Sequence, residues 1–178
     1  MKKNFFATMT ALFILAAASA GLAAEKSGEF SSFKAQDIQG NEVTQEVLAQ
    51  AELTVMNLWG TFCGPCLREM PGLGRLAAEY ESKGVQFVGV VLDALDQQGH
   101  INQKQVDKAR RLVEKTGAHF LHLLPSQDLM EAKLAAVYAI PETYFVDSKG
   151  KILDSVTGAM AEDQWRAKIE SVLASMRK

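Results

Sequence analysis

Trp59-Gly-Thr-Phe-Cys63-Gly-Pro-Cys66 is the stretch that decides the fold, because it holds both cysteines of the 178-residue chain. The preceding residues, 53–58, are apolar and favour a β-strand, whereas residues 67–80 carry apolar side chains at helical spacing. The Cys-x-x-Cys motif is therefore predicted to lie where a strand turns into a helix. Any thiol chemistry of this protein takes place there.

The first turn of a helix favours a negative charge. Unpaired backbone N–H groups and the positive end of the helix dipole lie at this turn, so we expect Cys63 to be partly a thiolate near neutral pH. Gly64 allows a tight turn, and Pro65 occupies a position where its missing N–H costs nothing. Two intervening residues bring the sulfurs close enough for a disulfide or a reactive dithiol, which indicates a redox pair.

Two structural roles for the cysteine pair are disfavoured. A structural zinc site needs four ligands; the motif supplies two, and the remaining candidates are His100, His119 and His122. His119 and His122 lie three positions apart in an extended segment and so point to opposite faces; no metal site is expected. A purely structural disulfide would close too short a loop to constrain the unfolded chain much.

The N-terminal residues predict export from the cytoplasm. Lys2 and Lys3 precede an apolar run, residues 5–18, which is followed by small residues. This pattern is typical of a secretory signal peptide over residues 1–24; the alternative is an uncleaved membrane anchor formed by residues 5–24. The segment contains no cysteine that could carry a lipid. The predicted location is thus periplasmic or otherwise extracytoplasmic, where disulfides persist.

Charge and composition limit the partners of the exported part. Removing residues 1–24 takes away two lysines and no acids, which leaves 17 basic and 21 acidic residues, a net charge of −4. A mildly acidic surface argues against nucleic acid as a partner. With 48% hydrophobic and 22% charged residues in the whole chain, the composition predicts one globular domain.

Strand and helix patterns alternate along the chain after a short polar tether, residues 25–32. The N-terminal hairpin and the last hairpin flank this alternation, so we expect an α/β fold with a central mixed sheet flanked by helices. The expected elements are a hairpin over 33–43, a short helix capped by Thr44 through 49, strands over 54–58, 85–92, 119–124, 143–146 and 151–156, and helices over 67–80 (interrupted by a kink at Pro71), 103–115, 126–138 and 161–176. The last helix is expected to turn Trp165, Ile169, Val172 and Met176 inward.

Several separated features together resemble the thioredoxin superfamily from about residue 30 to the C-terminus. They are Cys63-Gly-Pro-Cys66, Trp59, Pro71 and the Ile140-Pro141 pair. The export signal, Asn57 and an extra helix before the strand at 143–146 are similar to the TlpA/ResA/CcmG (DsbE) branch. Within this branch, Trp59-Gly-Thr61 and Pro141-Glu-Thr143 resemble the cytochrome c maturation thioredoxins.

The sequence also departs from those families at three positions. Asn57 stands where cytoplasmic thioredoxins carry a buried Asp, and Phe62 replaces the Trp usual before the first cysteine. The Gly64-Pro65 dipeptide is that of thioredoxin rather than of the cytochrome c maturation proteins. Asn57 cannot serve as the proton acceptor that this Asp provides, whereas the Gly64-Pro65 dipeptide bears on the pathway and leaves the disulfide exchange chemistry unchanged.

The resemblance implies a thioredoxin-like domain over residues 33–178 that reduces protein disulfides without a cofactor. Cys63 is then the nucleophile and Cys66 the resolving cysteine, while Trp59, Ile140 and Pro141, the last after a cis bond, contact the substrate. Implied partners are protein disulfides, with apocytochrome c cysteines among them, and a membrane thiol carrier of the CcdA/DsbD type as electron donor. We expect a monomer.

Glu69 is predicted to replace the missing Asp as proton acceptor. It follows Cys66 by three residues and so lies about 60° from it around the helix, and the CcmG and ResA proteins carry a Glu at this offset. No basic residue three or four positions away can pair with it, so we expect a raised pKa, from desolvation first and the nearby thiolate second. The alternative is a solvated helical glutamate.

Two other functions remain open. A copper(I) metallochaperone could use Cys63, Cys66 and either His119 or His122, because thiolates select this soft ion. A peroxidase is less favoured, since the sequence before Cys63 lacks the Pro and Thr arrangement of peroxiredoxins.

Overall fold

The computed structural model describes residues 28–178, so the predicted signal or anchor segment lies outside the described residues. Five strands form the central sheet in the order β5-β4-β3-β6-β7. Among residues 28–178, no helix combines the length and the apolar character needed to cross a bilayer.

The sheet is mixed, as predicted. β3 (Leu53–Trp59) lies at its centre and is buried along its whole length. β4 (Val85–Val91) and β5 (Leu121–Leu123) run parallel to it on one side, whereas β6 (Glu142–Asp147) pairs antiparallel on the other side and β7 (Ile152–Thr157) pairs antiparallel with β6. The nearly continuous apolar sequences of β3 and β4 match burial on both faces.

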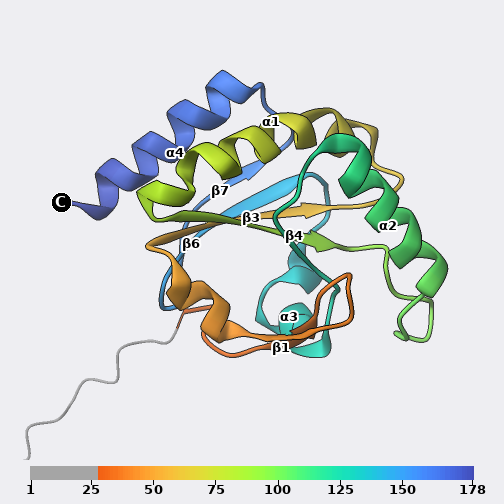
Figure 1. The fold of residues 1–178 in the computed structure, drawn as a ribbon. Helices are drawn as coiled ribbons and strands as arrows, with labels where there is room; N and C mark the ends of the chain where they lie inside the picture. The colour runs from red at the N-terminus through yellow and green to blue at the C-terminus, as the bar shows by residue number, and fades with distance from the viewer. Residues whose placement is uncertain (1–27) are drawn as a thin grey trace, which may run out of the picture.

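Three helices cover one face of the sheet (Figure 1): α1 (Gly64–Tyr80), α2 (Gln103–Thr116) and α4 (Glu162–Met176). Alternate β3 residues face this layer, where Val55 packs with Leu76 of α1 and Ile169 of α4. The 3-10 helix η2 (Glu81–Lys83) follows α1 and leads into β4.

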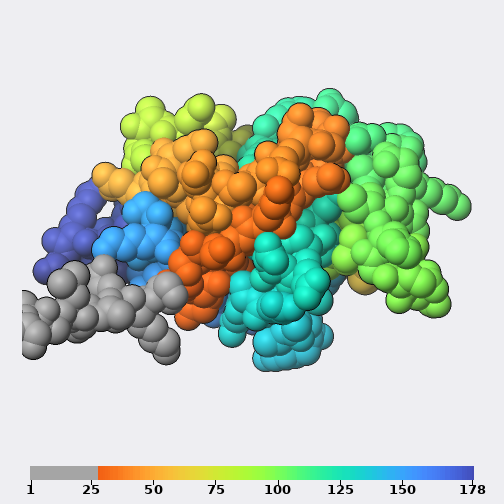
Figure 2. All heavy atoms as spheres, turned by 90° about the horizontal axis from the view of Figure 1, so that it is seen from below, coloured from red at the N-terminus to blue at the C-terminus, as the bar shows by residue number. Residues whose placement is uncertain are grey.

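The opposite face is covered by the N-terminal hairpin and by short helical turns. The hairpin consists of β1 (Lys34–Gln36) and β2 (Glu42–Thr44), and Thr44 caps the 3-10 helix η1 (Gln45–Gln50). Figure 2 shows these segments in orange beside the teal segment around α3 (Gln127–Ala132), to which β1 is joined by the hydrogen bond from Lys34 N to Asp128 Oδ2. Met56 and Leu58 of β3 pack against this layer.

The structure corrects several predicted boundaries. The helix predicted over 126–138 ends at Ala132, and a separate 3-10 turn, η3 (Leu134–Ala136), follows. The strand predicted over 119–124 is limited to β5. α1 continues through Pro71 rather than being interrupted there; its start after Cys63, with Pro65 in the first turn, is as predicted.

The burial of two side chains also differs from the prediction. Phe30, which the sequence places in a polar tether, is fully buried in the core, and its N–H donates to the Gly150 carbonyl. Residues 28–32 therefore pack on the domain. On α4, Trp165, Ile169 and Val172 are buried as predicted, but Met176, the last residue of the helix, is exposed.

Candidate active site

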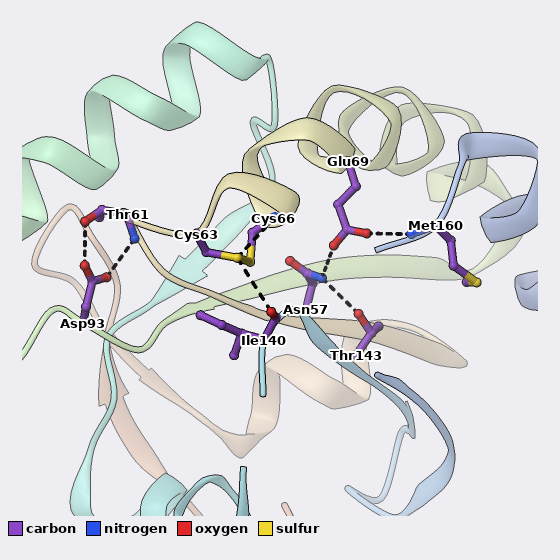
Figure 3. Close-up of a disulfide and its surroundings, with 9 residues drawn as sticks. All are labelled: Asn57, Thr61, Cys63, Cys66, Glu69, Asp93, Ile140, Thr143 and Met160. Atoms are coloured by element: carbon purple, nitrogen blue, oxygen red, sulfur yellow. Dashed lines mark hydrogen bonds between the residues drawn. A yellow bond between two sulfur atoms is a disulfide. The ribbon is translucent and has the colours of Figure 1, made fainter. Parts of the chain in front are cut away.

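The two cysteines form a disulfide at the N-terminus of α1 (Figure 3), with their Cα atoms 5.3 Å apart. Cys63 is the N-cap residue of the helix, and its Sγ accepts the backbone N–H of Cys66 at 3.2 Å. Cys63 is 6% exposed and Cys66 is fully buried. After reduction, the same N–H and the helix dipole stabilise a thiolate on Cys63.

The loop before β6 reaches the disulfide from the opposite side. The peptide bond between Ile140 and Pro141 is cis, and the Ile140 carbonyl oxygen lies 3.8 Å from Cys63 Sγ. In the disulfide the sulfur carries no hydrogen, so this is a contact rather than a hydrogen bond. The arrangement places backbone polar groups next to the sulfur that is closer to the surface.

Asp93 holds the loop that leads to Cys63. Its carboxylate accepts the backbone N–H of Thr61 at 2.9 Å and the Thr61 hydroxyl at 2.5 Å, and Gln105 Nε2 donates to it at 3.1 Å. Asp93 was not predicted from the sequence. Its position directly after the parallel strands is a detectable signal, because functional side chains gather beyond the carboxyl ends of such strands.

Trp59, which was predicted to contact the substrate, is fully buried. Its indole N–H donates to Nδ1 of His122 at 3.1 Å, while Nε2 of the same ring bonds the Ala118 carbonyl at 2.8 Å. Because the ring is desolvated, the pKa of His122 is lowered to about 4, and the imidazole is neutral at physiological pH. A side chain without exposed surface supports the redox loop from below, so the prediction of direct contact is corrected.

The histidines of the predicted His-x-x-His segment are not arranged as metal ligands. Both ring nitrogens of His122 are used within the fold, and the exposed His119 lies near Glu114. Residues 28–178 contain no cluster of three or more His, Cys, Asp or Glu side chains that could hold a metal.

Glu69 is 6% exposed, so it is not a solvated helical glutamate. One carboxylate oxygen, Oε1, accepts Asn57 Nδ2 at 3.1 Å; the other, Oε2, accepts the Met160 N–H and Trp165 Nε1, both at 3.2 Å. Asn57 is oriented by a second bond to Thr143 Oγ1 at 2.9 Å (Figure 3). Desolvation raises the pKa of Glu69, and the three donated hydrogen bonds oppose this rise.

Two aromatic side chains are exposed in the segments that meet at the disulfide. Phe62, directly before Cys63, is 71% exposed, and Tyr138, two residues before Ile140, is 90% exposed. Phe62 and Ile140 lie close together, because both would touch a Cβ atom placed on Gly60. Tyr138 was not predicted as a site residue, because the sequence pattern places it at the end of a helix.

The fold and the vicinal cysteine pair define the class as thioredoxin-like proteins. Residues 27–155 match the AhpC/TSA family, and the chain belongs to this family. It is 27% identical over 117 residues to the thiol-disulfide oxidoreductase ResA of Geobacillus thermodenitrificans, with 66% of this chain and 61% of that protein aligned. The match therefore spans less than two thirds of that relative.

Two further comparisons cover more of the related chain. ResA of Halalkalibacterium halodurans is 27% identical over 131 residues, which cover 74% of this chain and 68% of that protein. The solved structure described as MTB dsbF in its mixed oxidised and reduced forms is 26% identical with a TM-score of 0.63, over 81% of this chain and 96% of that chain.

Proposed function

We propose that this protein is an extracytoplasmic thiol-disulfide oxidoreductase that reduces protein disulfides through Cys63 and Cys66. The observation that carries the proposal is the asymmetry of the redox pair. Cys63 caps α1, approaches the surface and lies beside the Ile140 carbonyl, whereas Cys66 is fully buried one turn deeper. Similarity to proteins named thiol-disulfide oxidoreductases supports the same activity.

The proposed reaction consists of two exchanges. The Cys63 thiolate attacks one sulfur of the substrate disulfide; a Cys63–substrate disulfide forms and the other substrate sulfur leaves as a thiolate. Cys66 then loses its proton to the Glu69 carboxylate and attacks Cys63, which forms the Cys63–Cys66 disulfide and releases the second substrate thiolate. Two electrons pass to the substrate, and an external dithiol must reduce the protein again.

The substrate segment is proposed to dock in an extended form beside Pro141. The backbone of Ile140 next to Cys63 supports this pairing, and the exposed rings of Phe62 and Tyr138 supply apolar contact area on either side. Trp59 contributes by supporting the loop from within the core.

The proposed electron donor follows from the location outside the cytoplasm, and the proposed clients follow from the resemblance to the cytochrome c maturation thioredoxins. A membrane thiol carrier of the CcdA/DsbD type supplies electrons to the Cys63–Cys66 disulfide. The clients are oxidised cysteine pairs, including those of apocytochromes c awaiting haem.

The reduction potential of the pair, measured in glutathione buffers, tests the direction of electron flow. A value near thioredoxin's ~−270 mV is expected, whereas one near ~−120 mV indicates an oxidant. The matching activity assay compares reduction of insulin disulfides with oxidation of a reduced, unfolded protein. Efficient oxidation without any reduction contradicts the proposal.

Alkylation of the reduced protein tests the assignment of the nucleophile. With limiting iodoacetamide at mildly acidic pH, Cys63 should be labelled first, because its thiolate is stabilised and lies nearer the surface. The variants Cys63→Ser and Cys66→Ser give the reference rates of each thiol. Faster labelling of Cys66 than of Cys63 reverses the two roles.

A further inference from the structure

The Glu69 carboxylate is held by donors from three separate parts of the chain. Asn57 comes from β3 beneath α1, the Met160 N–H comes from the loop after β7, and the Trp165 indole comes from the first turns of α4. Figure 3 shows the Glu69 side chain descending from α1 toward Asn57, with Met160 on its other side. We call these three donors the carboxylate cradle.

Trp165 is the donor of the carboxylate cradle that comes from α4. The whole residue is buried, and its ring packs against Phe145 of β6 with centroids 6.4 Å apart. A buried indole N–H needs an acceptor, and here that acceptor is Glu69 Oε2. The hydrogen bond therefore couples α4 to a group that the proposed mechanism uses.

We propose that Trp165 is a positioning residue that holds Glu69 and sets its proton affinity, and thereby the pH dependence of the Cys66 step. The part that concerns the Cys66 step rests on the proposed function, whereas the effect of Trp165 on Glu69 does not. A donor to the charged form of a carboxyl group favours that form, so the indole N–H keeps Glu69 able to accept a proton although burial opposes its charge.

The groups around Glu69 are mostly neutral or paired with other residues, so, apart from burial, hydrogen bonds are the main control on its proton affinity. β3 and β6 present the neutral Asn57 and Thr143, and on α1 the titratable neighbour is Cys66 once the disulfide is reduced. On α4, Glu162 pairs with Arg75 and Arg166, and Arg166 also pairs with Glu79, while Asp163 is exposed.

The variant Trp165→Phe tests the inference, because it removes the N–H and keeps most of the ring. Tyr80→Phe is the matched control, since it also removes a hydrogen bond between α1 and α4, the 2.6 Å bond from Tyr80 to Glu170, without touching the cradle. The pKa of Glu69 is measured in the oxidised protein from its ¹³C carboxyl resonance. Trp165→Phe should raise this pKa by about one pH unit, the size of one hydrogen bond to a charged group, and Tyr80→Phe should leave it unchanged.

Stopped-flow reaction of the reduced protein with DTNB tests the link to the Cys66 step. The first thionitrobenzoate is released when Cys63 attacks, and the second when Cys66 resolves the mixed disulfide. Trp165→Phe should shift the pH profile of the second release to higher pH and leave the profile of the first release unchanged. In a Glu69→Gln background the shift should disappear.

Each outcome decides a separate point. An unchanged Glu69 pKa in Trp165→Phe overturns the inference, and so does a raised pKa with an unchanged second release. Should that variant not fold, the indole N–H resonance of Trp165 in the wild-type protein is followed instead; it must titrate with the midpoint of Glu69, and a flat response overturns the inference. Failure of the proposed function is distinct, because the protein then reduces no insulin disulfides, whereas the Glu69 titration and both thionitrobenzoate releases can still be measured.

Discussion

Gly89 of β4 provides a sharp test of how the redox loop is supported. In the sheet it pairs with Asn57 on one side and His122 on the other. A Cβ atom at this position would lie 2.1 Å from His122 Nδ1 and 3.0 Å from Trp59 Nε1. The variant Gly89→Ala must therefore displace the imidazole and break its hydrogen bond with Trp59.

The free energy of unfolding should fall by about 1–5.5 kcal/mol in Gly89→Ala, from overpacking and a lost hydrogen bond less a gain in entropy. Overpacking of a rigid core costs ~1–3 kcal/mol, and a buried indole N–H without an acceptor costs a further ~1–3 kcal/mol. The entropy gained by replacing a strand glycine offsets ~0.5–1 kcal/mol of this. The imidazole has no easy escape, because Phe120 stacks on it with ring centroids 4.6 Å apart.

Urea unfolding followed by circular dichroism measures the loss, and Gly72→Ala in α1 is the control. There a Cβ atom meets Glu162 Cβ at an ordinary 3.4 Å, so the variant should equal or exceed the wild type in stability through helix propensity. In a His122→Ala background most of the clash at position 89 disappears, and Gly89→Ala should cost much less. Additive losses of the two substitutions, or a loss below ~1 kcal/mol in Gly89→Ala, would refute the reasoning.

Two further predictions concern Glu69 and the exposed aromatic side chains. Because burial raises the pKa of Glu69, its contribution to stability is complete below the ordinary value of 4.5 and is lost as pH rises through the folded pKa. In urea unfolding from about pH 4 to pH 8, the stability of Glu69→Gln relative to the wild type should therefore increase as pH rises. A stability difference between the two proteins that stays constant over this range contradicts the prediction. Phe62→Ala and Tyr138→Ala should each lower kcat/KM for insulin reduction about tenfold while DTNB reactivity stays the same; equal losses with both reagents would exclude a role in substrate docking.

The central elements could be predicted because their signals are local. The apolar run of β4 and the cysteine motif at the strand-to-helix junction each lie within one stretch of sequence. Sequence periodicity failed at 126–138, where a continuous helix was predicted although the chain changes to a 3-10 turn after Ala132. That region precedes Pro141, and the geometry there is set by packing against the sheet rather than by helix propensity.

Contacts between distant residues explain what the sequence left out of the site. Glu69 was identified from its offset to Cys66, but its bond to Trp165 joins residues 96 positions apart. Trp59 was placed at the substrate surface by resemblance, whereas His122, 63 residues later, holds it in the core. Neither Trp165 as the partner of Glu69 nor His122 as the partner of Trp59 can be assigned from one sequence, because only the fold brings such distant residues together.

The burial of Cys66 has a consequence for the order in which electrons enter and leave the cysteine pair. Cys66 is fully buried, whereas Cys63 keeps 6% of its surface exposed, so the proposed reaction requires the oxidised client and the reduced donor to react at Cys63 in turn. If both react at Cys63, steady-state kinetics with the concentrations of client and donor varied should give parallel double-reciprocal lines. A high concentration of the client should then inhibit the reaction with the donor, and a high concentration of the donor should inhibit the reaction with the client, because each occupies the surface at Cys63.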